Sequence, residues 1–128
     1  MTNKLKTWCF GIDNDKLVEL VLSGEKTATT SLYDKDNIPK VGEKSILVYE
    51  NKKEACITET KEVIITQFKN ITEELAKLEG EGDKSLDYWR KTHYKFFKSI
   101  DSNFNENSII IFEIFEVIEN LNEGEVNI

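Results

Sequence analysis

The spacing of apolar residues in the first part of the chain predicts a helix. Leu17, Leu20 and Val21 recur at helical intervals and define one apolar face. Either Asp13 or Asn14 can cap the first turn of this helix, because both side chains accept hydrogen bonds from free amides. The pattern therefore predicts an amphipathic helix whose apolar face is buried.

Two more helices are predicted in the second half of the chain. A short one spans residues 71–78, and a break rich in glycine and acidic residues follows it at 79–83. Ser85 can cap a longer helix, because its hydroxyl accepts a hydrogen bond from an amide of the first turn. The apolar spine of that helix is formed by Leu86, Trp89, His93 and either Phe96 or Phe97.

Strands are predicted on both sides of these two helices. Residues 45–50 and 55–68 are strand-like, and the polar residues 51–54 between them form a turn, so the two make an antiparallel hairpin. Residues 109–118 form the strongest predicted strand, and their first positions are apolar on both faces, which indicates a central place in a sheet. This mixed order predicts an α+β fold with a small curved or closed sheet.

A cluster of polar residues follows the first helix directly. Gly24 stands where a helix stops in a left-handed turn, so the residues after it begin at a fixed position. Lys26 supplies a cation or, with a lowered pKa, a base. The hydroxyl groups around it suit an extended strand and offer donors, acceptors and a nucleophile. They belong to Thr27, Thr29, Thr30 and Ser31.

Composition narrows the class of protein. With 128 residues, of which 39% are hydrophobic and 32% charged, the chain is expected to form one globular domain over residues 1–128. No apolar run reaches the roughly 20 residues that span a membrane. No secretory signal is recognised either, so a cytoplasmic protein is expected. Cys9 and Cys56 fit no metal or redox spacing and are expected to be reduced and buried.

The net charge of −7 argues against strong binding of a nucleic-acid backbone, which usually requires an excess of Lys and Arg. The charge is unevenly placed. Basic residues gather between 84 and 98, around Arg90, whereas the residues from 113 onward carry five glutamates and no base. The basic segment could meet one or two phosphates, or it could be the solvated face of a helix.

Four motifs follow one another along nearly the whole chain. In order they are Trp8-x-Phe10-Gly11, Gly24-x-Lys26-Thr27-x-Thr29, Glu79-Gly80-Glu81-Gly82-Asp83-x-Ser85-Leu86-x-Tyr88-Trp89-Arg90-x-x-His93, and Phe112-Glu113-x-Phe115-Glu116-Val117. The third motif is the most specific of the four, because its acidic and glycine-rich stretch runs directly into Tyr88-Trp89-Arg90. With these motifs in this order, the chain resembles the ASCH-domain family of the PUA-like superfamily.

The resemblance implies a fold and a class of ligand. The fold is a small mixed or antiparallel β-barrel similar to the PUA domain, with flanking helices and a cleft lined by residues 24–29. The family was proposed to bind RNA; some members look like amidohydrolases acting on N4-acetylcytidine, and others have been assigned ribonuclease activity. The implied partner is a small nucleoside-like ligand or single-stranded RNA, and no cofactor is expected.

For the amidohydrolase members, the resemblance implies a functional lysine, threonine and glutamate. Carried over to this sequence, they are Lys26, Thr29 and either Glu79 or Glu81. Position 31 departs from the family pattern, because this chain has Ser31 where many members carry an arginine. Without that arginine, the site lacks a cation that could hold an oxyanion or a phosphate. The residues expected to contact a ligand are Trp8, Gly24, Thr27, Ser31, Tyr88 and Arg90.

Amide hydrolysis by Thr29 would require a base within hydrogen-bond reach. Lys26 is three residues away, and on a regular strand this spacing puts the two side chains on opposite faces, so the segment would have to be kinked. If Glu81 pairs with Lys26, the lysine stays charged and stabilises an oxyanion while the glutamate moves the proton. The other option is a Lys26 whose pKa is lowered toward neutrality, so that the amine is the base.

The acidic residues before the long helix do not predict a metal site. Glu79, Glu81 and Asp83 alternate as carboxylates do in calcium loops, but the remaining ligands of such a loop are missing. The glycines between them allow a tight turn, or allow the loop to swing its carboxylates into the cleft.

His93 and Glu113 are the remaining polar residues in apolar surroundings. His93 is the only histidine and lies on an apolar helix face, so a packed and hydrogen-bonded residue is expected. A carboxylate in an apolar strand either faces solvent or is buried with a partner. For Glu113, alternation indicates the buried position, with Lys26 or Arg90 as the partner.

Three functions remain open at this point. The first is a pocket for a modified nucleoside, with amide hydrolysis by Lys26, Thr29 and a loop glutamate. The second is a non-catalytic RNA-binding module, and the third is a ribonuclease. The negative net charge disfavours the last two as strong binders of polyanions. The sequence does not predict an oligomeric state.

Overall fold

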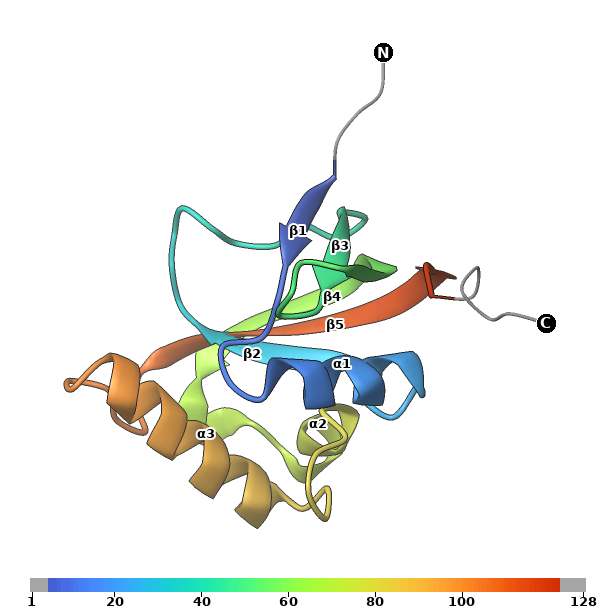
Figure 1. Cartoon of the computed structure of the whole chain (residues 1–128). Coiled ribbons are helices and arrows are strands. Elements are labelled where there is room, and N and C mark those ends of the chain that lie inside the picture. Colours follow the sequence, from blue (N-terminus) through green and yellow to red (C-terminus); the bar gives the residue numbers. More distant parts are fainter. Residues whose placement is uncertain (1–4, 123–128) are drawn as a thin grey trace.

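The computed structural model describes residues 5–122, which form five strands, three α-helices and one 3₁₀-helix (Figure 1). Their order is the mixed one that the apolar pattern predicts. Along the chain they are β1 (Lys6–Trp8), α1 (Asn14–Leu22), β2 (Ala28–Leu32), β3 (Lys44–Val48), β4 (Glu54–Gln67), the 3₁₀-helix η1 (Phe68–Asn70), α2 (Glu73–Leu78), α3 (Leu86–Ile100) and β5 (Ile109–Asn120).

The five strands form one mixed sheet that curls into a half-barrel (Figure 1). The strand order is β1-β3-β4-β5-β2, so β1 and β2 are the two edges. β1 runs parallel to β3, and the other neighbouring pairs are antiparallel. The register between the long strands β4 and β5 shifts at two places, as it does at the β-bulges that bend strands. This architecture confirms the predicted α+β, PUA-like fold.

The helices α2 and α3 cover one side of the curled sheet (Figure 1). Ala28 of β2 and the β5 residues Ile110 and Phe112 share a buried core with Trp89 and Phe97 of α3. Each large apolar side chain that leaves water in this way contributes about 1.5–3 kcal/mol to folding. This core fixes α3 against β2 and β5, and α3 forms one wall of the cavity described below.

A second core lies under α1. Val18 of α1 packs with Leu47 of β3, Cys56 of β4 and Phe115 of β5. Burial raises the pKa of the Cys56 thiol to about 11, so this cysteine is inert at neutral pH. The expectation that both cysteines are buried was wrong for Cys9, which is exposed because it lies just beyond the end of β1 rather than inside the sheet.

The turn after α1 holds the polar cluster in place. Gly24 ends the helix with a positive φ of 87°, as predicted. The amide of Lys26 donates to the carbonyl of Leu20 at 3.1 Å, and the amide of Thr27 donates to the carbonyl of Leu78 at 2.7 Å. The segment that carries Lys26 is therefore tied to the ends of both α1 and α2 before β2 begins.

The longest helix, α3, begins at the predicted cap. The hydroxyl of Ser85 accepts a hydrogen bond from the amide of Tyr88 at 3.0 Å. Over residues 5–122, no helix is both long and apolar enough to cross a membrane.

Candidate functional site

Lys26 and two loop glutamates form a buried ion-pair cluster. Lys26 is only 1% exposed, and its Nζ lies 2.5 Å from Glu79 Oε1 and 2.7 Å from Glu81 Oε2. It also donates to the main-chain carbonyl of Glu79 at 3.4 Å. The side chain of Glu79 is 2% exposed and that of Glu81 is 16% exposed. Both glutamates that the resemblance left open therefore meet Lys26, and Glu81 is the one that a ligand can reach.

The second oxygen of Glu79 collects donors from two further elements. Oε2 accepts hydrogen bonds from Thr30 Oγ1 of β2 at 2.5 Å and from Trp89 Nε1 of α3 at 3.0 Å. His93 Nε2, one helical turn after Trp89, lies 3.4 Å away. A carboxylate with this many donors is fixed in position and stays ionised.

Burial is the largest single influence on each pKa in the cluster, but the neighbouring charges together outweigh it and set the direction of the shift. Burial alone would lower the pKa of Lys26, but the carboxylates of Glu79 and Glu81 raise it. Burial alone would raise the pKa of Glu79, but Lys26 and His93 hold it well below its usual range. Burial would likewise lower the pKa of His93, but Glu79 raises it. This arrangement does not supply the lowered Lys26 pKa that an amine base would need.

A cavity of about 430 Å³ opens beside the cluster. Its walls come from residues 8–12 at the end of β1 and just beyond it, from residues 29–32 of β2 and from α3, so it lies between the two edge strands of the half-barrel. A volume of this size suits a small organic ligand. Besides the ion-pair cluster, its lining includes Trp8, Phe10, Thr29, Thr30, Ser31 and His93.

β2 presents an unpaired main-chain edge. Among the described strands it pairs with β5 alone. The ladder ends with the amide of Tyr33 donating to the carbonyl of Ile109 at 3.2 Å. Hydrogen-bonded residues alternate along an antiparallel ladder, so the main-chain groups of Thr30 and Leu32 are directed away from β5. Because these residues line the cavity, their N–H and C=O groups are available to a ligand.

Thr29 lies on the opposite face of β2 from Thr30 and outside the ion-pair cluster. Strand alternation separates the two side chains, and only Thr30 bonds to Glu79. Lys26 lies in the turn before β2, and over residues 5–122 no hydrogen bond joins it to Thr29. In the register of β2 and β5, Thr29 lies directly opposite Glu113.

Glu113 has a different partner from those predicted. Its Oε2 accepts a hydrogen bond from Thr60 Oγ1 of β4 at 2.6 Å, and neither Lys26 nor Arg90 pairs with it in the described part of the chain. Burial raises the pKa of Glu113, the hydrogen bond from Thr60 lowers it, and the charge of Glu43 raises it further. The prediction of a buried ion pair was wrong because β4 places a neutral hydroxyl next to this carboxyl.

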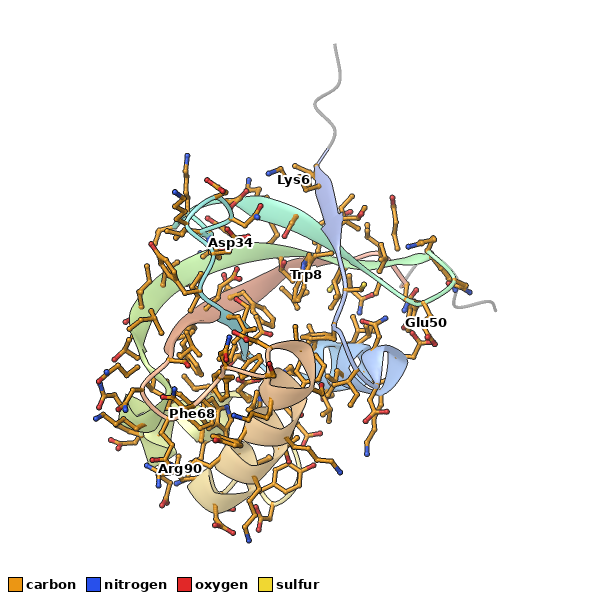
Figure 2. The ribbon with its side chains drawn as sticks, turned by 90° about the vertical axis from the view of Figure 1, so that its left-hand side faces the viewer. Lys6, Trp8, Asp34, Glu50, Phe68 and Arg90 are labelled. Carbon is orange, nitrogen blue, oxygen red and sulfur yellow. The ribbon has the colours of Figure 1, made fainter. Side chains whose placement is uncertain are left out.

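Two of the residues expected to contact a ligand line the cavity. They are Trp8 and Ser31. The indole Nε1 of Trp8 donates to Thr58 Oγ1 at 3.2 Å, which leaves the ring partly in the core and partly on the cavity, as expected. Trp8 and Arg90 lie in different regions of the molecule in Figure 2, and Arg90 does not reach this cavity.

Four of the residues expected to contact a ligand do not line the cavity, and they are Gly24, Thr27, Tyr88 and Arg90. Gly24 forms the helix stop, and the hydroxyl of Thr27 donates to the carbonyl of Leu78 at 3.3 Å. Tyr88 and Arg90 lie at the exposed start of α3. Gly24 and Thr27 hold the framework, Tyr88 is exposed, and Arg90 lines a different cavity along α3, so none of the four lies in the gap between β1 and β2.

Two residues of the cluster were not predicted as site residues. The sequence indicates Thr30 only as one of the hydroxyls near Lys26, and His93 as a packed helical residue. His93 is indeed packed, since its ring stacks on Trp89 at 4.5 Å and its Nδ1 bonds to the Trp89 carbonyl at 2.9 Å. It also faces Glu79 and the cavity. The four-residue spacing of Trp89 and His93 was the available signal, but it did not identify Glu79 as their common acceptor.

The arrangement does not suit a metal ion. Ligand atoms of Glu79, Glu81 and His93 lie within 4.8 Å of one another, which resembles a ligand set. However, the ammonium of Lys26 already bridges both carboxylates and supplies the positive charge that an ion would bring. Asp83 takes no part, because it accepts a hydrogen bond from the amide of Ser85.

The curled mixed sheet, its three helices and the cavity between its edge strands define an α+β domain of the PUA-like kind. Residues 6–119 match the family model described as ASCH domain, and the chain belongs to the ASCH domain family.

Solved structures agree with this assignment. The ASCH domain of Lactobacillus crispatus JV V101 is 31% identical, with a TM-score of 0.83 over 90% of this chain and 80% of that one. A protein from Enterococcus faecalis V583 is 28% identical, with a TM-score of 0.83 over 96% and 86%. An ASCH protein of Zymomonas mobilis, at 10% identity and a TM-score of 0.53 over 87% and 66%, shares the fold alone. No curated protein matches the chain.

Proposed function

We propose that the cavity beside the ion-pair cluster binds a nucleoside-like ligand and that the protein hydrolyses the amide of an N4-acylated cytidine. One observation carries this proposal: Lys26 with its buried ammonium, its two partner glutamates and Thr29 all line one cavity of about 430 Å³. Burying charges is costly, and charged groups that meet at a cavity are typical of functional sites.

The walls of the cavity suit a planar base. The free main-chain edge at Thr30 and Leu32 offers donors and acceptors in one line, which can pair with the polar edge of a pyrimidine. The aromatic rings of Trp8, Phe10 and Phe96 line the same space and offer apolar contact. Recognition by main-chain groups needs no arginine, so the serine at position 31 is compatible with a neutral ligand.

In the proposed reaction, Thr29 attacks the acyl carbonyl and Lys26 stabilises the oxyanion. The ammonium of Lys26 donates to three oxygens, and its bond to the Glu79 carbonyl, at 3.4 Å, is the longest. An oxyanion can replace that weakest acceptor without breaking either ion pair. Removing one oxyanion donor typically lowers kcat by roughly 100- to 1,000-fold.

Acetate release from N4-acetylcytidine tests the proposal. The purified protein should bind cytidine and release acetate, and Thr29→Ala should lower kcat at least about 100-fold while cytidine affinity stays within about threefold. Thr7→Ala is the matched control, because Thr7 is an exposed threonine of β1 that does not line this cavity. Full activity in Thr29→Ala would rule out the covalent route, and a wild-type protein that neither binds cytidine nor releases acetate would rule out the proposal.

A second candidate function is binding of single-stranded RNA without catalysis. A second cavity, of about 480 Å³, lies along another face of α3, and cations and aromatic rings together line it. Such a combination suits unpaired nucleotides, whose phosphates need charge and whose bases stack. Its basic and aromatic residues are Lys69, Arg90, Lys91, Lys95, Phe68 and Tyr94.

A further inference from the structure

Glu113 lies across from Thr29 on the same face of the half-barrel. The two residues are partners in the β2–β5 register, and directly opposed side chains have Cβ atoms about 4.5–5.5 Å apart. Both residues line the cavity. At this separation, a change of rotamer is enough to bring the carboxylate of Glu113 to the hydroxyl of Thr29.

The other carboxylates of the cavity are already engaged. Glu79 accepts four hydrogen bonds or ion pairs, and Glu81 is paired with Lys26. Glu113 Oε2 accepts one hydrogen bond, from Thr60, and no hydrogen bond reaches its Oε1 from any residue that the structure describes. Among the described residues, Glu113 is therefore the cavity carboxylate that has a free oxygen and no cationic partner.

The surroundings of Glu113 favour proton uptake. Burial raises its pKa, although the hydrogen bond from Thr60 lowers it, and the charge of Glu43 raises it further. A carboxyl with a raised pKa is a stronger base and works closer to neutral pH. The charged or titratable groups that line the cavities next to it are Lys6 and Glu43 on one side, and Cys9, Lys26, Glu79, Glu81 and His93 on the other.

We propose that Glu113 accepts the proton of Thr29 in the acyl transfer, an inference that rests on the proposed function. Oγ1 of Thr29 bonds to the acyl carbon while its proton passes to Glu113 Oε1, and the carbonyl π electrons move to the oxygen. The oxyanion then collapses, the C–N bond breaks, and Glu113 returns the proton to the departing amino nitrogen of cytidine.

The second half of the reaction uses the same group. A water molecule bonds to the carbon of the threonyl ester and gives a proton to Glu113. The ester C–O bond breaks, the proton moves to the oxygen of Thr29, and the carboxylic acid leaves. Cytidine and the acid are the products of one amide and one water, and both residues return to their starting states.

Hydrolysis of N4-acetylcytidine by Glu113→Gln tests this role. The variant should lose at least about 100-fold in kcat with KM within about threefold. The kcat/KM of the wild-type protein should rise with pH through the pKa of the base, and this rise should disappear in Glu113→Gln. Glu119→Gln, the same substitution at an exposed position of β5, is the control and should keep wild-type activity and pH profile.

Glu113→Asp keeps the test decisive if Glu113→Gln fails to fold. Its shorter carboxylate should retain the rise with pH at a kcat lowered about tenfold. Wild-type turnover and pH profile in Glu113→Gln, or the loss of the rise with pH in a folded Glu113→Asp, would overturn the role of Glu113 and leave the proposed function standing. A wild-type protein without cytidine binding or turnover would overturn the proposed function and this inference together.

Discussion

At the scale of single residues, Glu79 is the group on which the site depends most. Its carboxylate accepts hydrogen bonds from Lys26, Thr30 and Trp89 and lies next to His93. These partners come from the turn after α1, from β2 and from α3. A buried charge without partners is costly, so the loss of this one carboxylate leaves several polar groups unsatisfied.

Glu79→Gln should therefore lower the free energy of unfolding by about 3–5 kcal/mol, because it removes one partner of a buried ion pair. Glu116→Gln is a matched control in an exposed pair, 3.4 Å from Lys61, and should change the free energy by no more than about 0.5 kcal/mol. Urea unfolding followed by tryptophan fluorescence measures both variants. Equal losses in the two would contradict the importance assigned to the cluster.

His93 should make stability depend on pH near neutrality. Burial opposes its charge, but Glu79 raises its pKa above the usual 6.5 in the folded protein. Such a group stabilises the fold fully below its unfolded pKa, and the stabilisation is lost as pH rises through the folded pKa. The free energy of unfolding should fall above pH 6.5 by at most about 1.4 kcal/mol per pH unit.

Urea unfolding between about pH 6 and pH 9 measures this slope. His93 is the only histidine, so His93→Gln should remove most of the decline. The same decline in wild type and variant would show that another group causes it.

At the scale of elements, the loop between α2 and α3 is shaped by a close backbone contact. Gly80 has a φ of +68°, and a Cβ added to it would lie 2.1 Å from the carbonyl oxygen of Glu25. Only glycine allows the loop to approach the turn after α1 so closely. This approach brings Glu79 and Glu81, which flank the glycine, to Lys26.

Gly80→Ala should consequently be far more harmful than Gly24→Ala. Both glycines have a positive φ, but a Cβ on Gly24 would meet nothing within 4 Å. Gly24→Ala should cost only the left-handed conformation, about 1–2 kcal/mol. Gly80→Ala should cost at least about 2 kcal/mol more, because backbone must move. Thermal or urea unfolding compares the two, and similar losses would mean that the loop adapts freely.

Sequence patterns predicted the elements that are long enough to show a period. The spine of α3 extends over four turns and the hairpin of β3 and β4 has a clear turn, so both were found. β1 was missed because its three residues are too few to show alternation, and its strand conformation depends on pairing with β3.

The site was predictable only in part. The hydroxyl-rich segment identified Lys26, but its convergence with Glu79 and Glu81 came from the family resemblance. The partner of Glu113 could not be derived, because the register of β4 on β5 shifts between Thr60 and Glu62. One extra residue on one strand reverses the alternation that sequence reasoning relies on.

At the scale of the whole molecule, charge limits the second candidate function. The net charge is −7, and four cations line the groove along α3. If each met one phosphate of single-stranded RNA, the slope of log K against log salt would be no steeper than about −3. Binding should therefore be weak at physiological salt and should be detectable only at low salt.

A double variant, Arg90→Gln with Lys95→Gln, should make that slope shallower by about 1.4. Lys16→Gln, an exposed change on α1, should leave it unaltered. Fluorescence anisotropy with a labelled oligonucleotide measures the slopes. No binding of RNA at low salt would dispose of the RNA-binding candidate.

The cavity draws its walls from segments spread over the chain, from Trp8 through Lys26 and Glu79 to Glu113. Within the described residues, β2 joins the sheet through β5 alone, and β5 is the last strand to leave the ribosome. A nascent polypeptide that lacks β5 consequently has no wall on which to hold β2. The nucleoside binding proposed above would therefore protect the protein from proteases only once β5 has been synthesised.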